Sequence, residues 1–161
     1  MLVGLSGTTV WLSFLVRKET NDTNEAVVTL GTGEFYQQEF ATVRFGFNGL
    51  DKRDAPRFWS LQVRNPENKE WVAIPTEVPV EPGKTVLMVA RLTFGQKDGV
   101  SLFVNPPLGN QAPVIPSAEY TSEKGRKLNF RGLVIWGGAP GSSAFDEIRF
   151  GDSFKAVTPG K

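Results

Sequence analysis

The segment 84–104 constrains the fold more than any other part of the sequence. Apolar residues occupy every second position in 84–94, and the same alternation returns in 100–104 after a turn at 95–99 that begins and ends with glycine. A period of two is typical of β-strands, because successive side chains point to opposite faces. The segment therefore predicts a β-hairpin. Its alternating apolar residues are Val86, Met88, Ala90, Leu92 and Phe94, then Val100, Leu102 and Val104.

Short alternating runs of this kind recur along the chain, and no segment sustains a helical period. In residues 8–18 both faces of the expected strand are largely apolar, which predicts a central strand that is covered on both sides. The further strands are expected at 25–30, 40–47, 58–64, 70–74, 128–136 and 144–150.

The connections between these runs also carry information. Strands 58–64 and 70–74 predict a second hairpin, and the prolines that follow at 75, 79 and 82 keep the next stretch out of any central ladder. The proline-rich, polar stretch 105–127 is expected to be a long loop. The small residues at 137–143 are interpreted as a hairpin loop between the last two strands.

Composition agrees with an all-β domain. The chain has 161 residues, with 12 Phe, 4 Trp, 17 Gly and 11 Pro, a mixture of strand-forming and turn-forming residues that favours a sandwich or barrel. We expect a single domain spanning residues 1–161, which is compatible with a piece of a longer protein.

Charge and residue types exclude several functions. The 18 basic and 17 acidic residues leave a net charge of +1, so no basic footprint for nucleic acid or anionic membranes is expected. The chain has no cysteine and no histidine, which excludes disulfides, a Ser-His-Asp triad and a histidine zinc site. The apolar run 10–16 is too short to span a bilayer, so no membrane insertion is predicted.

Three segments together resemble a known family. Residues 9–17 are similar to an early strand of concanavalin A-like, laminin-G-like jelly-roll domains, and 86–92 with 100–106 are similar to their central hairpin. Residues 145–149 resemble the closing strand of that family. The resemblance implies an antiparallel two-sheet sandwich, the concanavalin A-like jelly roll. It also implies a non-catalytic module of secreted, surface or multidomain bacterial proteins, which would be extracellular or at the cell surface and often binds carbohydrate.

Exposed aromatic residues flanked by polar ones are the candidates for such binding, because sugar rings stack on aromatic faces. Tyr36, Trp71 and Trp136 adjoin polar or small residues and are the predicted stacking side chains, although each is also compatible with a half-buried strand position. Asn105 and Arg91 are the predicted hydrogen-bonding residues. Trp59 alternates with apolar neighbours and is expected in the core.

The leading prediction is therefore a non-catalytic, lectin-like module whose partner is a polysaccharide or glycan. The alternative is a structural or adhesive spacer that docks other domains of a large surface protein and has no small ligand. Burial of all four Trp would favour the spacer, and aromatic side chains clustered on an open groove would favour binding.

A glycosidase is the third possibility, and the sequence argues against it. Retaining glycosidases need two carboxylates roughly 5 Å apart, and no Glu-x-Asp-x-x-Glu run occurs in the chain. The neighbours Asp146 and Glu147 would point to opposite faces of a strand. We therefore expect no enzymatic activity.

Asp146 is separated from Ile148 and Phe150 by even numbers of positions, so it is expected to lie on the same strand face as these apolar residues. It would then face inward and pair with an arginine or with backbone amides. No cofactor is required by the sequence. If a metal binds, calcium is the ion expected, held by oxygens of Asp98, Asp146 or Asn105.

Overall fold

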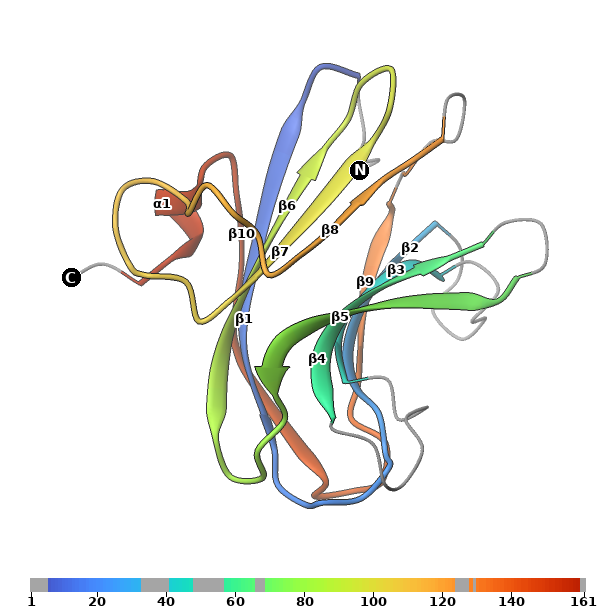
Figure 1. Cartoon of the computed structure of the whole chain (residues 1–161), viewed down its shortest axis with the longest axis vertical. Helices are drawn as coiled ribbons and strands as arrows, with labels where there is room; N and C mark the ends of the chain where they lie inside the picture. The colour runs from blue at the N-terminus through green and yellow to red at the C-terminus, as the bar shows by residue number, and fades with distance from the viewer. Residues whose placement is uncertain are drawn as a thin grey trace.

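The computed structural model describes residues 6–32, 41–47, 57–65, 69–123, 128 and 130–159. Tyr36, a predicted stacking residue, lies outside this part of the chain. The described residues form ten strands and one short helix, and the strands make two five-stranded antiparallel sheets that face each other (Figure 1). This confirms the predicted all-β, antiparallel two-sheet sandwich. In the described part of the chain, no helix has the length and apolarity needed to cross a bilayer.

Each sheet combines strands that are distant in sequence. The first sheet has the order β10 (Ser143–Gly151), β1 (Thr9–Lys18), β6 (Thr85–Thr93), β7 (Gly99–Val104) and β8 (Ala118–Thr121). The second sheet has the order β5 (Trp71–Pro79), β4 (Phe58–Arg64), β3 (Ala41–Phe47), β2 (Ala26–Gly31) and β9 (Gly132–Trp136).

Both predicted hairpins are present. β6 pairs with β7 and β4 pairs with β5, in each case antiparallel. β5 contains Pro75 and Pro79 and lies at the edge of its sheet, as expected for a residue type that has no N–H to donate to a ladder.

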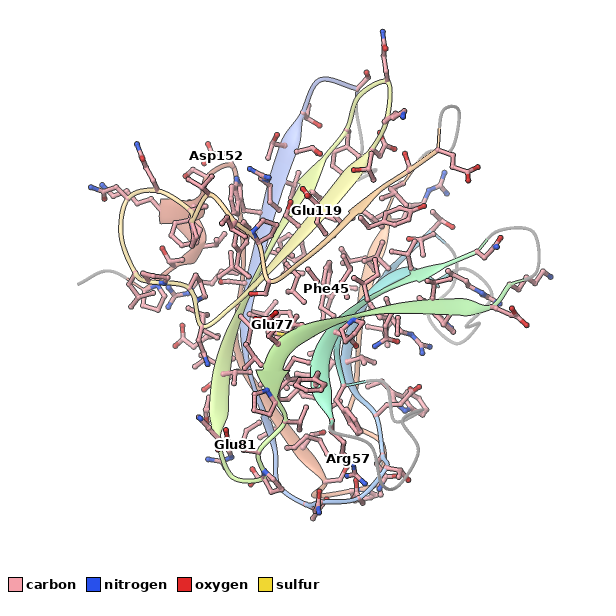
Figure 2. The ribbon with its side chains drawn as sticks, in the orientation of Figure 1. Phe45, Arg57, Glu77, Glu81, Glu119 and Asp152 are labelled. Carbon is pink, nitrogen blue, oxygen red and sulfur yellow. The ribbon has the colours of Figure 1, made fainter. Side chains whose placement is uncertain are left out.

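The alternating apolar residues of the two sheets meet in one core. Leu12 and Leu102 from the first sheet and Phe45 and Leu61 from the second are fully buried in it, and Figure 2 shows Phe45 between the two sheets. Trp59 is also fully buried there, which confirms its predicted core position.

A second, smaller apolar cluster lies on the outer face of the first sheet. Trp11 stacks on Phe103 with ring centroids 6.1 Å apart and meets the edge of Phe154 at 5.6 Å. Phe154 begins the short helix α1 (Phe154–Val157), which Ser13 fixes to the sheet by donating from Oγ to the Val157 carbonyl at 2.5 Å. β1 is therefore covered on both faces, as its two apolar faces predicted.

Three expectations about the connections are corrected. The stretch 105–127 contains strand β8, and β9 begins at Gly132 rather than at residue 128. The segment 137–142 is not a hairpin loop, because β9 pairs with β2 in one sheet while β10 pairs with β1 in the other. It crosses between the sheets alongside the β1–β2 connection, and the two are joined by a hydrogen bond from the Glu19 amide to the Ser142 carbonyl, 2.9 Å long.

A β-bulge in β10 overturns the expected orientation of Asp146. Ser13 is opposite Arg149 and Leu15 is opposite Asp146, so β10 has one residue more than β1 between these pairs. Glu147, within the bulge, has a φ of 55°. The extra residue reverses the alternation before it, and Asp146 consequently lies on the outer face and is exposed.

The β1–β2 connection is held by a buried lysine. Lys18 Nζ donates to Asp22 Oδ1 at 2.7 Å and to the Asn24 carbonyl at 2.9 Å. Arg57, near the bottom of Figure 2, donates to the Asp22 carbonyl at 2.7 Å. The hydrogen bond from Lys18, assisted by one from Thr20, holds the pKa of Asp22 well below its usual range.

This lowered pKa predicts a pH dependence of stability. Because the folded carboxyl binds its proton less readily than the unfolded one, Asp22 contributes stability above the unfolded pKa of about 4, and that contribution is lost as the pH falls further. Urea unfolding between pH 5 and pH 2 should show wild type more stable than Asp22→Asn at the upper end of this range, with the gap closing on acidification. If the free energies of unfolding of the two proteins changed in parallel with pH, the lowered pKa of Asp22 would be contradicted.

Candidate functional site

The outer face of the second sheet carries a group of polar side chains. Leu61 and Val63 point into the core, so Ser60 and Gln62 of the same strand point outward. On β3, Arg44 likewise alternates with core residues. The strands of this sheet curve along their length, with the outer face on the inside of the curve (Figure 1).

The register of the sheet aligns these side chains in rows. Thr29, Arg44, Gln62 and Ala73 are successive partners across β2, β3, β4 and β5. Of these, Thr29, Arg44 and Gln62 are buried although they lie on the outer face. Side chains opposite one another on the same face of antiparallel strands have Cβ atoms about 5 Å apart, so Thr29, Arg44 and Gln62 form a contiguous row of largely buried polar side chains.

The two predicted stacking tryptophans lie at opposite corners of this face. Trp71 begins β5 and is paired with Arg64, whereas Trp136 ends β9 and is paired with Val27. Trp136 is 52% exposed and Trp71 is partly exposed. We call Thr29, Arg44, Ser60 and Gln62, together with Trp71 and Trp136, the polar strip.

Arg44 is fixed between two partners. The centre of its guanidinium lies 4.1 Å from the centroid of the Trp71 ring, and its Nη1 lies 3.3 Å from Glu25 Oε1. Burial lowers the pKa of Arg44, Glu25 counteracts this, and nearby Arg64 adds to the lowering. The stacking holds the Trp71 ring in place, which leaves Trp136 as the more accessible of the two aromatic side chains.

Gln62 has a fixed amide orientation. Ser60 Oγ donates to the Gly46 carbonyl at 3.0 Å, so its oxygen is free to accept from Gln62 Nε2, 3.2 Å away. The amide oxygen of Gln62 is therefore directed away from Ser60. Within the described part of the chain, Gln62 Oε1 and Arg44 Nε are both buried and both lack a hydrogen-bond partner.

These two unpartnered atoms are complementary to a hydroxyl group. Arg44 Nε is a donor and Gln62 Oε1 is an acceptor, and the two residues are direct partners across β3 and β4. A hydroxyl both accepts and donates, so one that reached both atoms would satisfy them. Both atoms are buried, so the side chains that cover them must move aside before a ligand hydroxyl reaches them. An unsatisfied buried polar group costs about 1–3 kcal/mol, and a group that completed the pair would recover much of that cost.

The other predicted binding residues lie elsewhere. Arg91 is on the outer face of the first sheet, where its guanidinium is 5.8 Å from the centroid of the Trp11 ring and Nη2 donates to Ser101 Oγ at 3.1 Å. Asn105 Oδ1 accepts from the Leu87 amide at 2.9 Å, so Asn105 closes the end of the β6–β7 pair. The structure does not bring either residue together with the tryptophans.

The residues expected to hold calcium do not form one site. Asp98 is buried, and its two carboxylate oxygens accept from the amides of Gly95 at 3.0 Å and Leu128 at 2.6 Å. Asp146 lies beside Leu15, whereas Asp98 adjoins the end of the sheet near Thr9. The two carboxylates are thus about 20 Å apart along the strand direction. No group of three acidic, histidine or cysteine residues able to hold a metal occurs among the described residues.

Sequence reasoning identified the two corner tryptophans but not the polar residues between them. Arg44 and Gln62 stand at the polar positions of alternating strands, where a side chain is ordinarily expected to be solvated. The one sequence signal for Arg44 was its place between two apolar residues of a short predicted strand. The cross-strand pairing with Gln62 depends on register, which the sequence alone does not give.

The comparisons identify the fold. No protein-family model matches the chain, and no curated protein matches its sequence. The globular domain of T. cruzi calreticulin aligns over 98% of this chain and 68% of its own, with a TM-score of 0.61 and 14% identity. An endo-β-1,4-glucuronan lyase from the fungus Trichoderma reesei aligns over 94% of this chain and 71% of its own, with a TM-score of 0.56 and 10% identity.

These likenesses and the two facing sheets place the chain in a class: all-β sandwich domains of the jelly-roll type. At such identities the likeness concerns the fold. The narrower resemblance to laminin-G-like modules rests on the sequence segments already described.

Proposed function

We propose that the protein is a non-catalytic carbohydrate-binding module that holds its ligand on the polar strip. The observation that carries the proposal is the unpartnered donor–acceptor pair of Arg44 Nε and Gln62 Oε1, on a face with tryptophans at two corners. Sugars offer both complements, since their hydroxyls match the donor and acceptor and their C–H faces stack on indole rings.

The charges of the strip fit binding better than glycoside hydrolysis. Hydrolysis of the usual kind needs a close pair of carboxylates, whereas Glu25, at the margin of the strip, is already paired with Arg44. The glucuronan lyase among the structural neighbours acts, by its name, on a polysaccharide. A lyase-like activity is therefore the enzymatic alternative to be tested.

The test is a glycan-array screen of the purified protein, including glucuronan, run with calcium and again with a chelator. Binding that survives chelation supports a site built from aromatic and polar side chains. A folded protein that binds no glycan overturns the proposal and favours the structural or adhesive spacer. Shortening of glucuronan with formation of unsaturated ends would instead show a lyase.

For a glycan found in the screen, Trp136→Ala should weaken binding at least tenfold, a change of about 1.4 kcal/mol, because Trp136 is the accessible stacking surface. Isothermal titration calorimetry measures the affinity, and thermal unfolding confirms that the variant is folded. Phe150→Ala is the matched control, since Phe150 is 53% exposed against 52% for Trp136 but belongs to the first sheet. Equal losses in the two variants would contradict the assignment of the strip.

We propose further that the module acts outside the cell, or on its surface, as part of a larger protein. This follows from the proposed ligand and from the family resemblance of the sequence. Antibody labelling of intact and permeabilised cells would test it, and labelling only after permeabilisation would overturn it.

A further inference from the structure

A cavity of about 200 Å³ opens between the two sheets, on the side where β10 and β9 are the edge strands. On the opposite side the sandwich is closed, because β8 packs against β4 and β5. The residues that line the cavity are almost all apolar: Val10, Leu30, Leu92, Phe130, Arg131, Gly132, Leu133 and Phe150.

Phe150 shows that this side of the sandwich is open. It is paired with Leu12, a fully buried core residue, so its side chain lies on the inner face of the first sheet. An inner-face aromatic would ordinarily be covered, yet Phe150 is 53% exposed. Ile135, whose partner Val28 is also a core residue, is likewise exposed on β9. The two edge strands thus leave apolar surface uncovered on this side of the sandwich, and Phe150 lines the cavity.

Arg131 gives the cavity a charge. It is the one charged residue among the described residues that line it, and its guanidinium has no hydrogen-bond or ion-pair partner in the described part of the chain. Its backbone is fixed by an amide hydrogen bond to the Gly31 carbonyl, 2.8 Å long. A cation beside an apolar cavity is complementary to an amphiphile that carries an anionic head.

We infer that this cavity binds a small amphiphile with an apolar chain and a carboxylate, of the medium-chain fatty acid class, with the carboxylate on Arg131. The volume holds at least six carbons of the chain, since an engineered apolar cavity of about 150 Å³ binds benzene, and the rest of the ligand lies at the open side of the cavity. Burial of the chain supplies affinity that grows with each methylene removed from water, and the arginine selects the anionic head. The site is separate from the polar strip, and the inference does not depend on the proposed glycan binding.

Octanoate and octanol are the probes, because they share a chain and differ in the charge of the head. Titration followed by NMR should show saturable binding of octanoate, with shifts at Val10, Leu133 and Phe150. Arg131→Gln should weaken octanoate at least tenfold and leave octanol unchanged. Arg17→Gln is the matched control, because Arg17 is paired with Glu19 at the far end of β1 and should leave both affinities unchanged.

A second variant tests the cavity itself. Val10→Phe places a larger side chain in the cavity and should abolish the binding of both probes; if this variant does not fold, Phe150→Ala, which should weaken both, replaces it. Absence of saturable octanoate binding to the wild-type protein would overturn the inference. Equal loss of octanoate and octanol in Arg131→Gln would overturn the assignment of the carboxylate to Arg131. Trp136→Ala should leave octanoate binding intact, which separates this site from the polar strip.

Discussion

Replacing Gly46 by Ala is expected to lower the free energy of unfolding by at least about 3 kcal/mol. Gly46 has a φ of 137°, and a Cβ at this position would lie 2.0 Å from the Ala26 carbonyl oxygen. The clash is with backbone, so no side-chain rotation relieves it. β3 is paired with β2 on one side and β4 on the other, and any shift that relieved the clash would disrupt a ladder.

Urea denaturation measures the loss, and Gly83→Ala is the matched control. Gly83 also has a positive φ, 78°, but a Cβ there would meet nothing within 4 Å. It should therefore show only the conformational cost, about 1 kcal/mol. If the two variants lose equal stability, the close approach of β2 is not the reason why position 46 needs glycine. The Gly46 carbonyl also accepts from Ser60, so Gly46→Ala should weaken glycan binding as well.

The second large effect is expected at Lys18. Lys18→Ala should lower the free energy of unfolding by about 2–4 kcal/mol. The side chain is only 1% exposed, its ammonium donates to Asp22 and Asn24, and it lies 5.6 Å from the centroid of the Phe47 ring. The substitution removes these contacts, leaves a cavity and frees the β1–β2 connection.

Lys84→Ala is the control for this prediction. Lys84 is also paired with a carboxylate, that of Glu81 at 3.0 Å, but both side chains are more than half exposed. An exposed pair of this kind contributes about 0–1 kcal/mol, so the midpoint of urea unfolding should barely move. A comparable loss in Lys84→Ala would show that burial is not the reason for the effect at Lys18.

The strands were largely predictable because their signal is local. Alternation identified the β6–β7 hairpin, since it depends only on side-chain direction. The prolines at 75 and 79 were expected outside any central ladder, and they lie in β5, which is longer than the predicted strand and stands at the sheet edge. The strand β8 was missed because four residues in a proline-rich stretch carry too little pattern. The crossing of 137–142 was missed because the choice of partner strand depends on distant β1 and β2.

In the candidate site, too, local patterns predicted some features and pairing between distant strands decided the others. Trp71 and Trp136, which were singled out by their polar and small neighbours, lie on one face of the second sheet, whereas Arg91 and Asn105 lie away from them. The predicted orientation of Asp146 was wrong because a bulge, which has no clear sequence signal, changes the face to which the residues before it point. Arg44 and Gln62 became a pair only through the register of β3 on β4.

By itself, the sequence determined the class of structure: alternation, turns and composition require two apolar sheet faces to be buried against each other. The tertiary structure decided which side chains meet. It placed an unpartnered donor beside an unpartnered acceptor on the polar strip, and it left the sandwich open beside Phe150 and Arg131. Such juxtapositions arise from pairing and packing between distant strands, and the free energy of those contacts is not encoded in any local pattern.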